Sequence, residues 1–351
     1  MKPFLYHLLK HLVRITSRFA FRRVEVRGMD RVPWEKPCIV SPNHQNAFLD
    51  ALLVGAFAPV ELTYLSRASV FGTRLDWFLD AFRMVPIYRR RDGFGTLSRN
   101  EQIFDALREK LRRGESMVMF SETEHALTYH LRPISRGSAR FALESQTAID
   151  REVLVVPVGI NYYHHTRPGF KVSVVVGEPL PAREYMDRYR AHEADGINAL
   201  REDLTDAMKE CLLVPEKTDD YRERVDRINR KNEGVSFPEM KRALRTPETL
   251  APKGEHRPGL ETLAQWISPL NAGPLWLAST LMRRVDEPAF AASLKFAVGM
   301  LVLPVWWLLL FGVGTWGAGP TVGAGGTGLA VLTMGLRLVL IRHSNPPHPI
   351  D

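Results

Sequence analysis

The stretch Ser41–Gly55, "SPNHQNAFLDALLVG", sets the end of a strand, a polar loop and an apolar helix next to one another. The residues "PCIVS" form a short apolar run typical of a buried strand, and "NAFLDALLVGAF" is typical of the helix that follows. His44 lies in the loop between them, because Pro42 and Asn43 favour non-helical backbone. A strand that leads directly into a helix is the repeating unit of an α/β fold.

Apolar runs and helical patterns alternate in the same way over residues 24–182. Further strands are expected at "VEVRG", "RMVPIYR", "SMVMF", "VLVVPVGI" and "FKVSVVVGEPL". One helix is expected over "LSRNEQIFDALREKLRRG", where Ser98 and Glu101 form a capping box and Gly114 ends the helix, and another over "GSARFALES". The alternation predicts an α/β domain with a mixed or mainly parallel sheet flanked by helices.

Residues outside this domain fall into segments of different composition. They are an amphipathic membrane-surface helix over residues 1–23, a charged helical segment over 183–258, a linker and membrane-proximal helix over 259–290, and an apolar hairpin over 291–342. In the first segment, apolar residues recur at helical spacing while His7, His11, Arg14 and Arg18 line another face. This pattern indicates a helix on a membrane surface or a helix packed on the domain core, and both can hold in part. The basic residues that interrupt its apolar run argue against a cleavable signal.

The apolar hairpin is predicted from an uncharged stretch, Phe296 to Leu336, bounded by Lys295 and Arg337. Its first run, "FAVGMLVLPVWWLLLFGVGTW", reaches the about 20 residues that a membrane-spanning helix needs. The second, "LAVLTMGLRLVLI", reaches that length only if the Gly-rich stretch before it, expected as a turn, adds helix and Arg337 extends its charge to the interface. We expect a membrane hairpin, with a re-entrant or interfacial second leg, or a hairpin buried in the core, as alternatives. Basic residues at both ends place them on the cytoplasmic side.

The charge balance, with 47 Lys and Arg against 39 Asp and Glu, gives a net charge of +8 that suits an anionic partner. Nucleic acid is disfavoured because no aromatic residues alternate with the basic ones and no nucleic-acid-binding motif is found. An anionic lipid surface or a phosphorylated substrate remains.

Neither the two cysteines nor a pair of adjacent histidines indicates a metal site. Cys38 and Cys211 lie far apart without metal-ligand spacing, so we expect two reduced thiols, as on the cytoplasmic side of a membrane. His164 and His165, in "NYYHHTRPG", are adjacent and would point apart on a strand. A mobile loop near the site is therefore favoured over metal binding.

His44 and Asp50 are the candidate catalytic residues. A carboxylate beside an imidazole fixes its tautomer and stabilises the imidazolium, so the other ring nitrogen can accept a proton from a hydroxyl. Six residues is a poor same-face spacing on a regular helix, so the two side chains meet only if His44 lies in the loop before the helix. A lone histidine here is more often structural, and the nearby carboxylate is what favours catalysis.

These residues resemble the first motif of the glycerolipid acyltransferases, the family of lysophosphatidic acid and glycerol-3-phosphate acyltransferases. That motif is His, four residues and Asp, usually preceded by Asn. Here Asn43 and His44 match, while Asp50 comes one residue late. The longer gap is similar to a branch that includes some glycerol-3-phosphate and dihydroxyacetone-phosphate acyltransferases.

The second motif of the family ends a strand with an arginine that holds the phosphate of the acceptor. In "RMVPIYRRRDG", Pro86, Ile87 and Arg89 match, and Arg83 replaces the usual leading Gly. A guanidinium suits a phosphate because it combines charge with a planar pair of donors. A basic surface loop near lipid headgroups is the alternative.

The third motif is normally Phe-Pro-Glu-Gly, and "FSETEH" keeps Phe120 and Glu122 but has Ser121 for Pro and Thr123 for Gly. Loss of the Gly changes the backbone open to this loop, since Thr tolerates positive φ badly. Glu122 is expected to bind a glycerol hydroxyl or to orient an arginine, unless it is a solvated loop carboxylate.

Two further segments extend the resemblance. "LRPISRGSARFAL" is similar to a family segment in which Arg136 takes the place of a lysine, and "VVPVGI", with Pro157, is similar to the fourth motif. The motifs occur in the family's order within the α/β region. The charged helices and the apolar hairpin lie outside the resemblance.

The resemblance implies an acyltransferase in which His44 is the general base and Asp50 orients it. The substrate contacts that it implies are Asn43, Arg89, Glu122 and Arg136. It also implies acyl-CoA or acyl carrier protein thioester as co-substrate, with no cofactor and no metal. The expected reaction acylates the free hydroxyl of 1-acyl-sn-glycerol 3-phosphate and makes phosphatidic acid for phospholipid biosynthesis at a membrane. Glycerol 3-phosphate or dihydroxyacetone phosphate as acceptor, or an inactive lipid-binding relative, are the alternatives.

Overall fold

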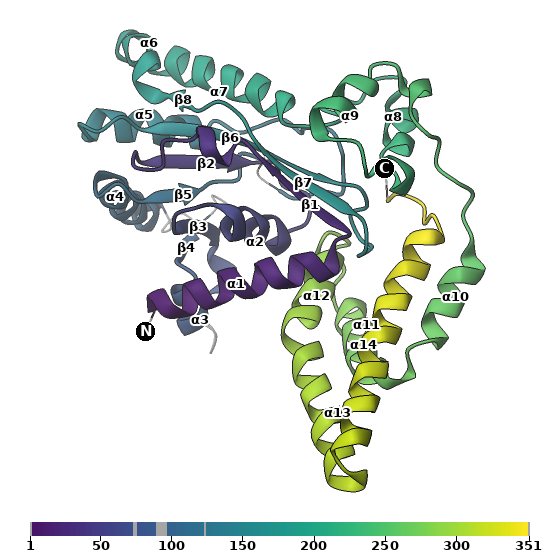
Figure 1. The fold of residues 1–351 in the computed structure, drawn as a ribbon. Helices are drawn as coiled ribbons and strands as arrows, with labels where there is room; N and C mark the ends of the chain where they lie inside the picture. The colour runs from purple at the N-terminus through teal and green to yellow at the C-terminus, as the bar shows by residue number, and fades with distance from the viewer. Residues whose placement is uncertain (1, 73–75, 89–96, 123, 350–351) are drawn as a thin grey trace.

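The computed structural model describes residues 2–72, 76–88, 97–122 and 124–349, and it centres on a sheet of eight strands (Figure 1). The strands are β1 (Arg23–Arg27), β2 (Cys38–Pro42), β3 (Leu62–Arg67), β4 (Met84–Ile87), β5 (Ser116–Val118), β6 (Leu154–Tyr162), β7 (Lys171–Val176) and β8 (Leu180–Pro181). Their order is β1-β7-β6-β2-β5-β3-β4, with β8 pairing with β6.

The sheet is mixed, which confirms the predicted fold class. Strand β6 is antiparallel to β7 and β8, and the remaining pairs are parallel. The carboxyl ends of β2, β3, β4 and β5 therefore lie along one edge. Open α/β sheets place their reactive side chains at such an edge.

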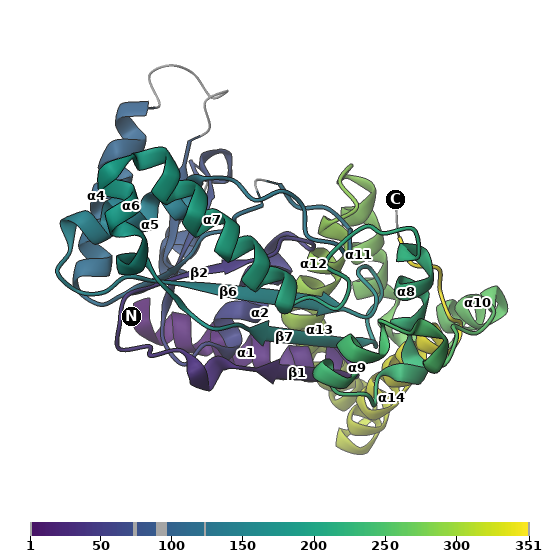
Figure 2. The same ribbon diagram turned by 90° about the horizontal axis from the view of Figure 1, so that it is seen from above.

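Helices cover both faces of the sheet (Figures 1 and 2). These helices are α1 (Lys2–Ala20), α2 (Phe48–Phe57), α3 (Asp76–Ala81), α4 (Leu97–Arg112), α5 (Gly137–Ala148), α6 (Met186–Ala191) and α7 (Glu193–Glu210). Helices α1 and α2 pack on one face with a core that includes Val13 and Leu53, while α4, α5 and α7 pack on the other over Leu107, Phe141 and Leu204. Each helix buries one apolar stripe, so the two cores follow from helical periodicity.

The remaining helices come after the sheet. They are α8 (Tyr221–Arg227), α9 (Phe237–Ala243), α10 (Pro258–Trp266), α11 (Ala272–Arg283), α12 (Phe290–Ala297), α13 (Leu303–Ala318) and α14 (Pro320–His343). A π-helical turn, Val298–Val302, joins α12 to α13 in one rod. This rod and α14 form a hairpin that projects away from the sheet (Figure 1).

Helix α1 packs on the domain core, which is one of the two placements expected from the sequence. Its buried face, with Val13 and Tyr6, lies on the domain core. Lys10 and Arg14 donate to the carbonyls of Ala58 and Ala56 at the end of α2, where unpaired helix carbonyls favour cations. Phe4, Leu8, Ile15 and Phe19 of α1 remain exposed, which leaves room for the membrane contact that the sequence also predicts.

One strand of the sheet was missed in the sequence, and one prediction about the hairpin was wrong. Strand β3 was not predicted, because most of its residues are only half-buried and give no clear alternation. The Gly-rich stretch was expected as a turn, but the turn is limited to Gly319 and α14 begins at Pro320. A Cβ at Gly314 would lie 2.8 Å from the Cα of Gly323, so glycine allows the two legs to approach closely.

The two legs of the hairpin are long and apolar enough to cross a membrane. The continuous helices Phe290–Ala318 and Pro320–His343 each contain an 18-residue stretch, with mean hydropathies of 2.3 and 1.7, that is mostly exposed. Arg337 does not extend outward as expected, because its guanidinium donates to the carbonyl of Ala264 in α10. The contact with α10 lets a charged residue lie within an apolar helix.

A cluster of buried histidines lies where the C-terminal segment returns to the domain. His348 Nδ1 lies 2.8 Å from the hydroxyl of Tyr129, and His165 Nε2 lies 2.9 Å from Gln45 Oε1. The expectation of a mobile loop at His164 and His165 was therefore wrong, since both side chains are buried. Burial lowers the pKa of His165 to about 4 and that of His348 to about 3.

These histidines predict an acid-sensitive fold. They are neutral when folded, and their pKa returns to about 6.5 on unfolding, so the unfolded state binds more protons at low pH. The contribution of these histidines to the free energy of unfolding should be constant above about pH 7. It should fall between about pH 6.5 and 4, by up to about 1.4 kcal/mol per histidine per pH unit. Thermal unfolding between pH 8 and 5 tests this. His348→Gln should flatten the pH dependence, whereas substitution of the exposed His192 by Gln should not, and equal stability at pH 8 and 5 would contradict the account.

Candidate active site

The sequence-predicted pair His44 and Asp50 meets at the carboxyl end of β2. His44 Nδ1 lies 2.9 Å from Asp50 Oδ2, because His44 is in the loop and Asp50 is in the first turn of α2. Asp50 is fully buried, whereas the His44 side chain is 17% exposed. Among the described residues no hydrogen-bond partner is given for Nε2 of His44, so the pair with Asp50 is made through Nδ1 alone.

The Asp50 carboxylate is held by four donors. The backbone N–H groups of Gln45 and Asn46 each donate to Oδ2 at 2.7 Å, in addition to the contact with His44. The hydroxyl of Tyr162, at the end of β6, donates to Oδ1 at 2.7 Å. With donors on both oxygens, the carboxylate has one rotamer and fixes the imidazole beside it.

The extra residue between His44 and Asp50 is absorbed by a strained turn. Ala47 has a φ of 45° and a ψ of −123°, a region that glycine adopts freely and other residues rarely adopt. Such a conformation costs of order 1–3 kcal/mol and persists only when its surroundings hold it. The turn points two backbone N–H groups at Asp50, so the longer spacing still brings the pair together.

Glu122 clamps the loop that carries His44. Its Oε2 accepts the backbone N–H of His44 at 2.6 Å, and its Oε1 accepts that of Arg132 at 2.7 Å. Burial raises the pKa of Glu122, and these two N–H groups oppose that shift. Both oxygens thus hold backbone, and the contact with a glycerol hydroxyl stays a prediction.

Aromatic rings surround the imidazole. Phe120 stacks on His44 with ring centroids 4.0 Å apart, and the ring of His125 meets it edge-on at 5.2 Å. Burial, followed by the nearby His44, lowers the pKa of His125, while Glu287 opposes this shift. Glu287 Oε1 lies 2.7 Å from His125 Nε2. Sequence reasoning missed His125, although it lies within the quoted third motif, and nothing local indicated Glu287.

The remaining predicted contacts have different placements. Arg89 lies outside the described residues. The side chain of Asn43 is buried and binds the backbone N–H and C=O of Ile160, so it ties β2 to β6. Its predicted substrate contact, like that of Arg89, stays a prediction.

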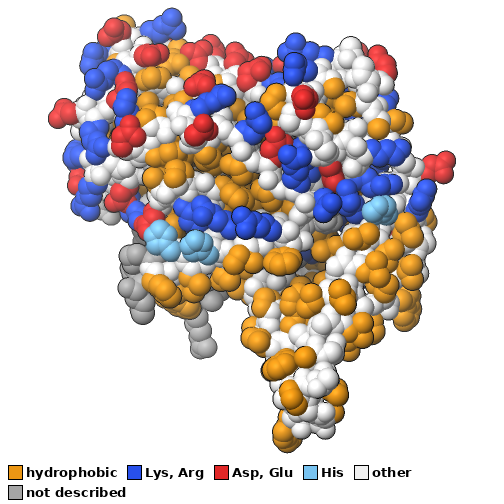
Figure 3. Space-filling model, viewed as in Figure 1, with side chains coloured by type: hydrophobic (Ala, Val, Ile, Leu, Met, Phe, Trp, Pro, Cys, Tyr) orange, Lys and Arg blue, Asp and Glu red, His pale blue; other side chains and the backbone are white. Residues whose placement is uncertain are grey.

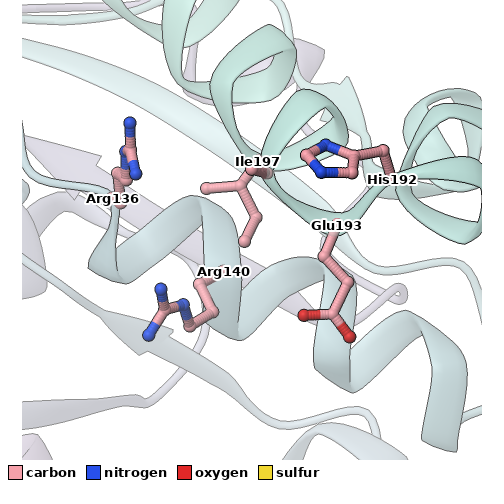
Figure 4. Close-up of a pocket in the computed structure, with 6 residues that line it drawn as sticks. Arg136, Arg140, His192, Glu193 and Ile197 are labelled. Carbon is pink, nitrogen blue, oxygen red and sulfur yellow. The ribbon is translucent and has the colours of Figure 1, made fainter.

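Arg136 lines a separate pocket. It lies with Arg140, His192, Glu193 and Ile197 around an open space of about 370 Å³ between α5 and α7 (Figure 4). No contact given by the described part of the chain joins its side chain to the His44 site. Its predicted substrate contact is therefore untested.

Arg67, which the sequence did not single out, ends β3 at the same sheet edge as His44. None of the described carboxylates pairs with its guanidinium. Its charge also lowers the pKa of His125, after the larger effects of burial and of His44. Arg67 is thus a cation beside the site that sequence reasoning missed because no motif marks it.

An α/β sheet with a His–Asp pair at its strand ends defines a candidate hydrolase or transferase, and similarity to known proteins narrows this class. Residues 23–161 match the family model described as Acyltransferase. The 1-acyl-sn-glycerol-3-phosphate acyltransferase of Pseudomonas aeruginosa is 26% identical over 131 residues, which are 37% of this chain and 49% of that protein. The chain thus matches about half the length of this curated relative.

A solved structure is also similar. The crystal structure of the 1-acyl-sn-glycerophosphate (LPA) acyltransferase PlsC from Thermotoga maritima has a TM-score of 0.44 at 18% identity, over 59% of this chain and 79% of that chain. The conclusion rests on the family model and the curated relative. Both are similarities of residues 23–161 or of part of the chain, and both agree with the resemblance to glycerolipid acyltransferases that the motifs predicted.

Tyr162 and Tyr163 offer a matched test of the carboxylate network. Tyr162→Phe removes a donor to the buried Asp50, which should cost about 1.5–3 kcal/mol of stability and lower activity. Tyr163→Phe removes a buried hydroxyl that has no hydrogen-bond partner among the described residues, so it should be neutral or stabilising. Urea or thermal unfolding of both variants measures the difference. Equal effects of the two substitutions would contradict the assigned role of Tyr162.

Proposed function

We propose that the protein transfers a fatty acyl group from a thioester to the free hydroxyl of 1-acyl-sn-glycerol 3-phosphate, which yields phosphatidic acid. The observation that carries the proposal is the His44–Asp50 contact at the sheet edge of the family-matched region, with no described residue bonded to Nε2 of His44. The name of the Pseudomonas aeruginosa relative supports this choice of acceptor.

In the proposed mechanism His44 acts as general base. The acceptor hydroxyl gives its proton to Nε2 while its oxygen attacks the thioester carbonyl, and Asp50 stabilises the resulting imidazolium through Nδ1. Collapse of the tetrahedral intermediate breaks the C–S bond, and the leaving thiolate takes the proton back from His44. The new C–O ester bond replaces the thioester, and no net proton is consumed.

Direct attack by the acceptor is favoured because the nearby nucleophilic side chains are unsuited to a covalent step. The Ser121 hydroxyl is buried and lies within hydrogen-bond distance of the hydroxyls of Ser41 and Ser138. Burial raises the pKa of the Cys38 and Cys211 thiols to about 12. A thiol with so high a pKa is a poor nucleophile at neutral pH.

Arginine is the proposed anchor for the acceptor phosphate. Arg89 remains the candidate from sequence, and Arg67 joins it because it lies at the same sheet edge without a described carboxylate partner. A guanidinium binds phosphate through charge and paired donors, and a fixed anchor places the hydroxyl at a set distance from His44. Glycerol 3-phosphate or dihydroxyacetone phosphate is the second candidate acceptor, favoured by the longer His44-to-Asp50 spacing.

We also propose that the protein works at a membrane, with its active site on the cytoplasmic face. Figure 3 shows apolar side chains gathered over the projecting hairpin, with Lys and Arg above them. Exposed large apolar residues belong to α1, α10, α11 and the hairpin: Phe4, Phe19, Trp266, Trp276, Leu308, Trp316 and Leu332. Apolar surface with a basic border fits an anionic lipid surface.

Acyl transfer by purified protein in lipid tests the proposed reaction. Lysophosphatidic acid and glycerol 3-phosphate are offered in parallel, each with acyl carrier protein and coenzyme A thioesters. The wild type should acylate lysophosphatidic acid, and His44→Ala should abolish turnover without unfolding the protein, because the substitution removes the proposed base. His256→Ala, on the exposed linker, is the control and should retain activity. Turnover by His44→Ala near the wild-type rate would refute the base assignment.

Membrane extraction tests the proposed location. The wild-type hairpin should stay with vesicles through high-salt and alkaline washes. A Leu308→Arg and Leu332→Arg double variant should be released, since a charge at the centre of a spanning helix costs about 2.5–3.5 kcal/mol. Glu202→Arg, on the exposed face of α7, should stay bound. Release of the wild type by salt alone would contradict insertion of the hairpin.

A further inference from the structure

A serine of the C-terminal hairpin reaches into the loop that carries His44. The Ser293 hydroxyl, in α12, donates to the carbonyl of Asn46 at 2.6 Å and accepts the backbone N–H of Leu49 at 3.0 Å. Ser293 is buried, and it comes 244 residues after Leu49. One hydroxyl thus bridges both sides of the turn at Ala47.

That turn is the strained part of the loop. Asn46 supplies one of the N–H groups that hold Asp50, and Leu49 directly precedes Asp50. Leu49 N–H also donates to the carbonyl of Asn46 at 3.0 Å, so Ser293 closes a small three-membered network. A strained backbone needs such external contacts to persist.

Helix α12 is itself firmly seated. Phe296 of α12 and Met300 of the π-helical turn after it belong to the same core cluster as Leu49 and Leu53 of α2, and Lys295 Nζ donates to the carbonyl of Thr166 at 2.8 Å. On the side of the active site, Phe290 packs against Phe48 with ring centroids 6.0 Å apart and meets His125 edge-on at 5.1 Å.

A residue just before α12 also contacts the side chains around His44. Glu287 Oε1 lies 2.7 Å from His125, and His125 in turn contacts the ring of His44. Residues 287–293 therefore contact His125 through a carboxylate and an aromatic ring, and they contact the loop of His44 through the Ser293 hydroxyl. Helix α12 is the first part of the candidate membrane span Phe290–Ala318.

We propose that α12 completes the active site and that Ser293 is a positioning residue for the reaction. Ser293 holds the Ala47 turn, the turn holds Asp50, and Asp50 orients His44. The proposal rests on the proposed acyl transfer for its kinetic readout. It ties the geometry of the catalytic loop to a helix outside the family-matched region, which ends at residue 161.

The kinetic test compares Ser293→Ala with Ser293→Thr in the full-length protein in lipid. Ser293→Ala removes the bridging oxygen, and a small misplacement of a catalytic group lowers rate by up to about 100-fold. We expect kcat to fall about 10- to 100-fold with KM for the acceptor nearly unchanged, and a shifted pH profile of kcat/KM. Ser293→Thr keeps the hydroxyl and should restore most of kcat. Ser279→Ala, which removes an exposed hydroxyl in α11, should behave as wild type.

A second readout does not depend on turnover. Hydrogen exchange of the peptide that covers residues 45–50 should speed up in Ser293→Ala, return toward wild type in Ser293→Thr and stay unchanged in Ser279→Ala. Wild-type kcat, pH profile and exchange in Ser293→Ala would overturn the proposal. If the wild type transfers no acyl group, the proposed function fails, and the exchange data alone then decide whether Ser293 holds the loop.

Discussion

The buried carboxylate of Asp50 is the group on which the rest of the site depends. It lies in an apolar interior beneath α2, where a carboxylate is tolerated only when it is fully hydrogen-bonded. Its four donors come from the β2–α2 loop and from β6, so strand pairing, loop conformation and helix start must all be correct before His44 is oriented. The sheet brings the β2–α2 loop and Tyr162 together because β2 pairs directly with β6.

The loop around Asp50 is held from outside as well as from within. Glu122 fixes the backbone of His44 from the end of β5, Asn43 ties the loop to Ile160, and Ser293 bridges the strained turn from the hairpin. Glu122 and Asn43 pair buried backbone groups, and leaving such a group unpaired costs about 1–3 kcal/mol. A reactive imidazole at a strand end is thus made rigid by parts of the chain that lie far apart in sequence.

Short stretches of sequence were enough to predict much of the fold but only part of the site. The alternation of apolar runs predicted the mixed sheet, and the order of Asn43, His44 and Asp50 predicted the pair, because both signals lie within short windows. Strand β3 gave too weak a pattern, and the Gly-rich stretch hid a helix whose glycines allow close packing of two legs. Tyr162, Glu287 and Ser293 reach the site only through tertiary structure, so no local signal marks them.

The role proposed for Asp50, to make His44 a base by holding its Nδ1, is tested by the kcat of Asp50→Asn, with thermal stability determined in parallel. The substitution keeps the size of the side chain but supplies N–H groups in place of an acceptor, which favours the wrong tautomer of His44. We expect a folded variant whose kcat falls by about 1,000-fold or more. A folded Asp50→Asn protein that retains a kcat within about tenfold of the wild type would contradict it.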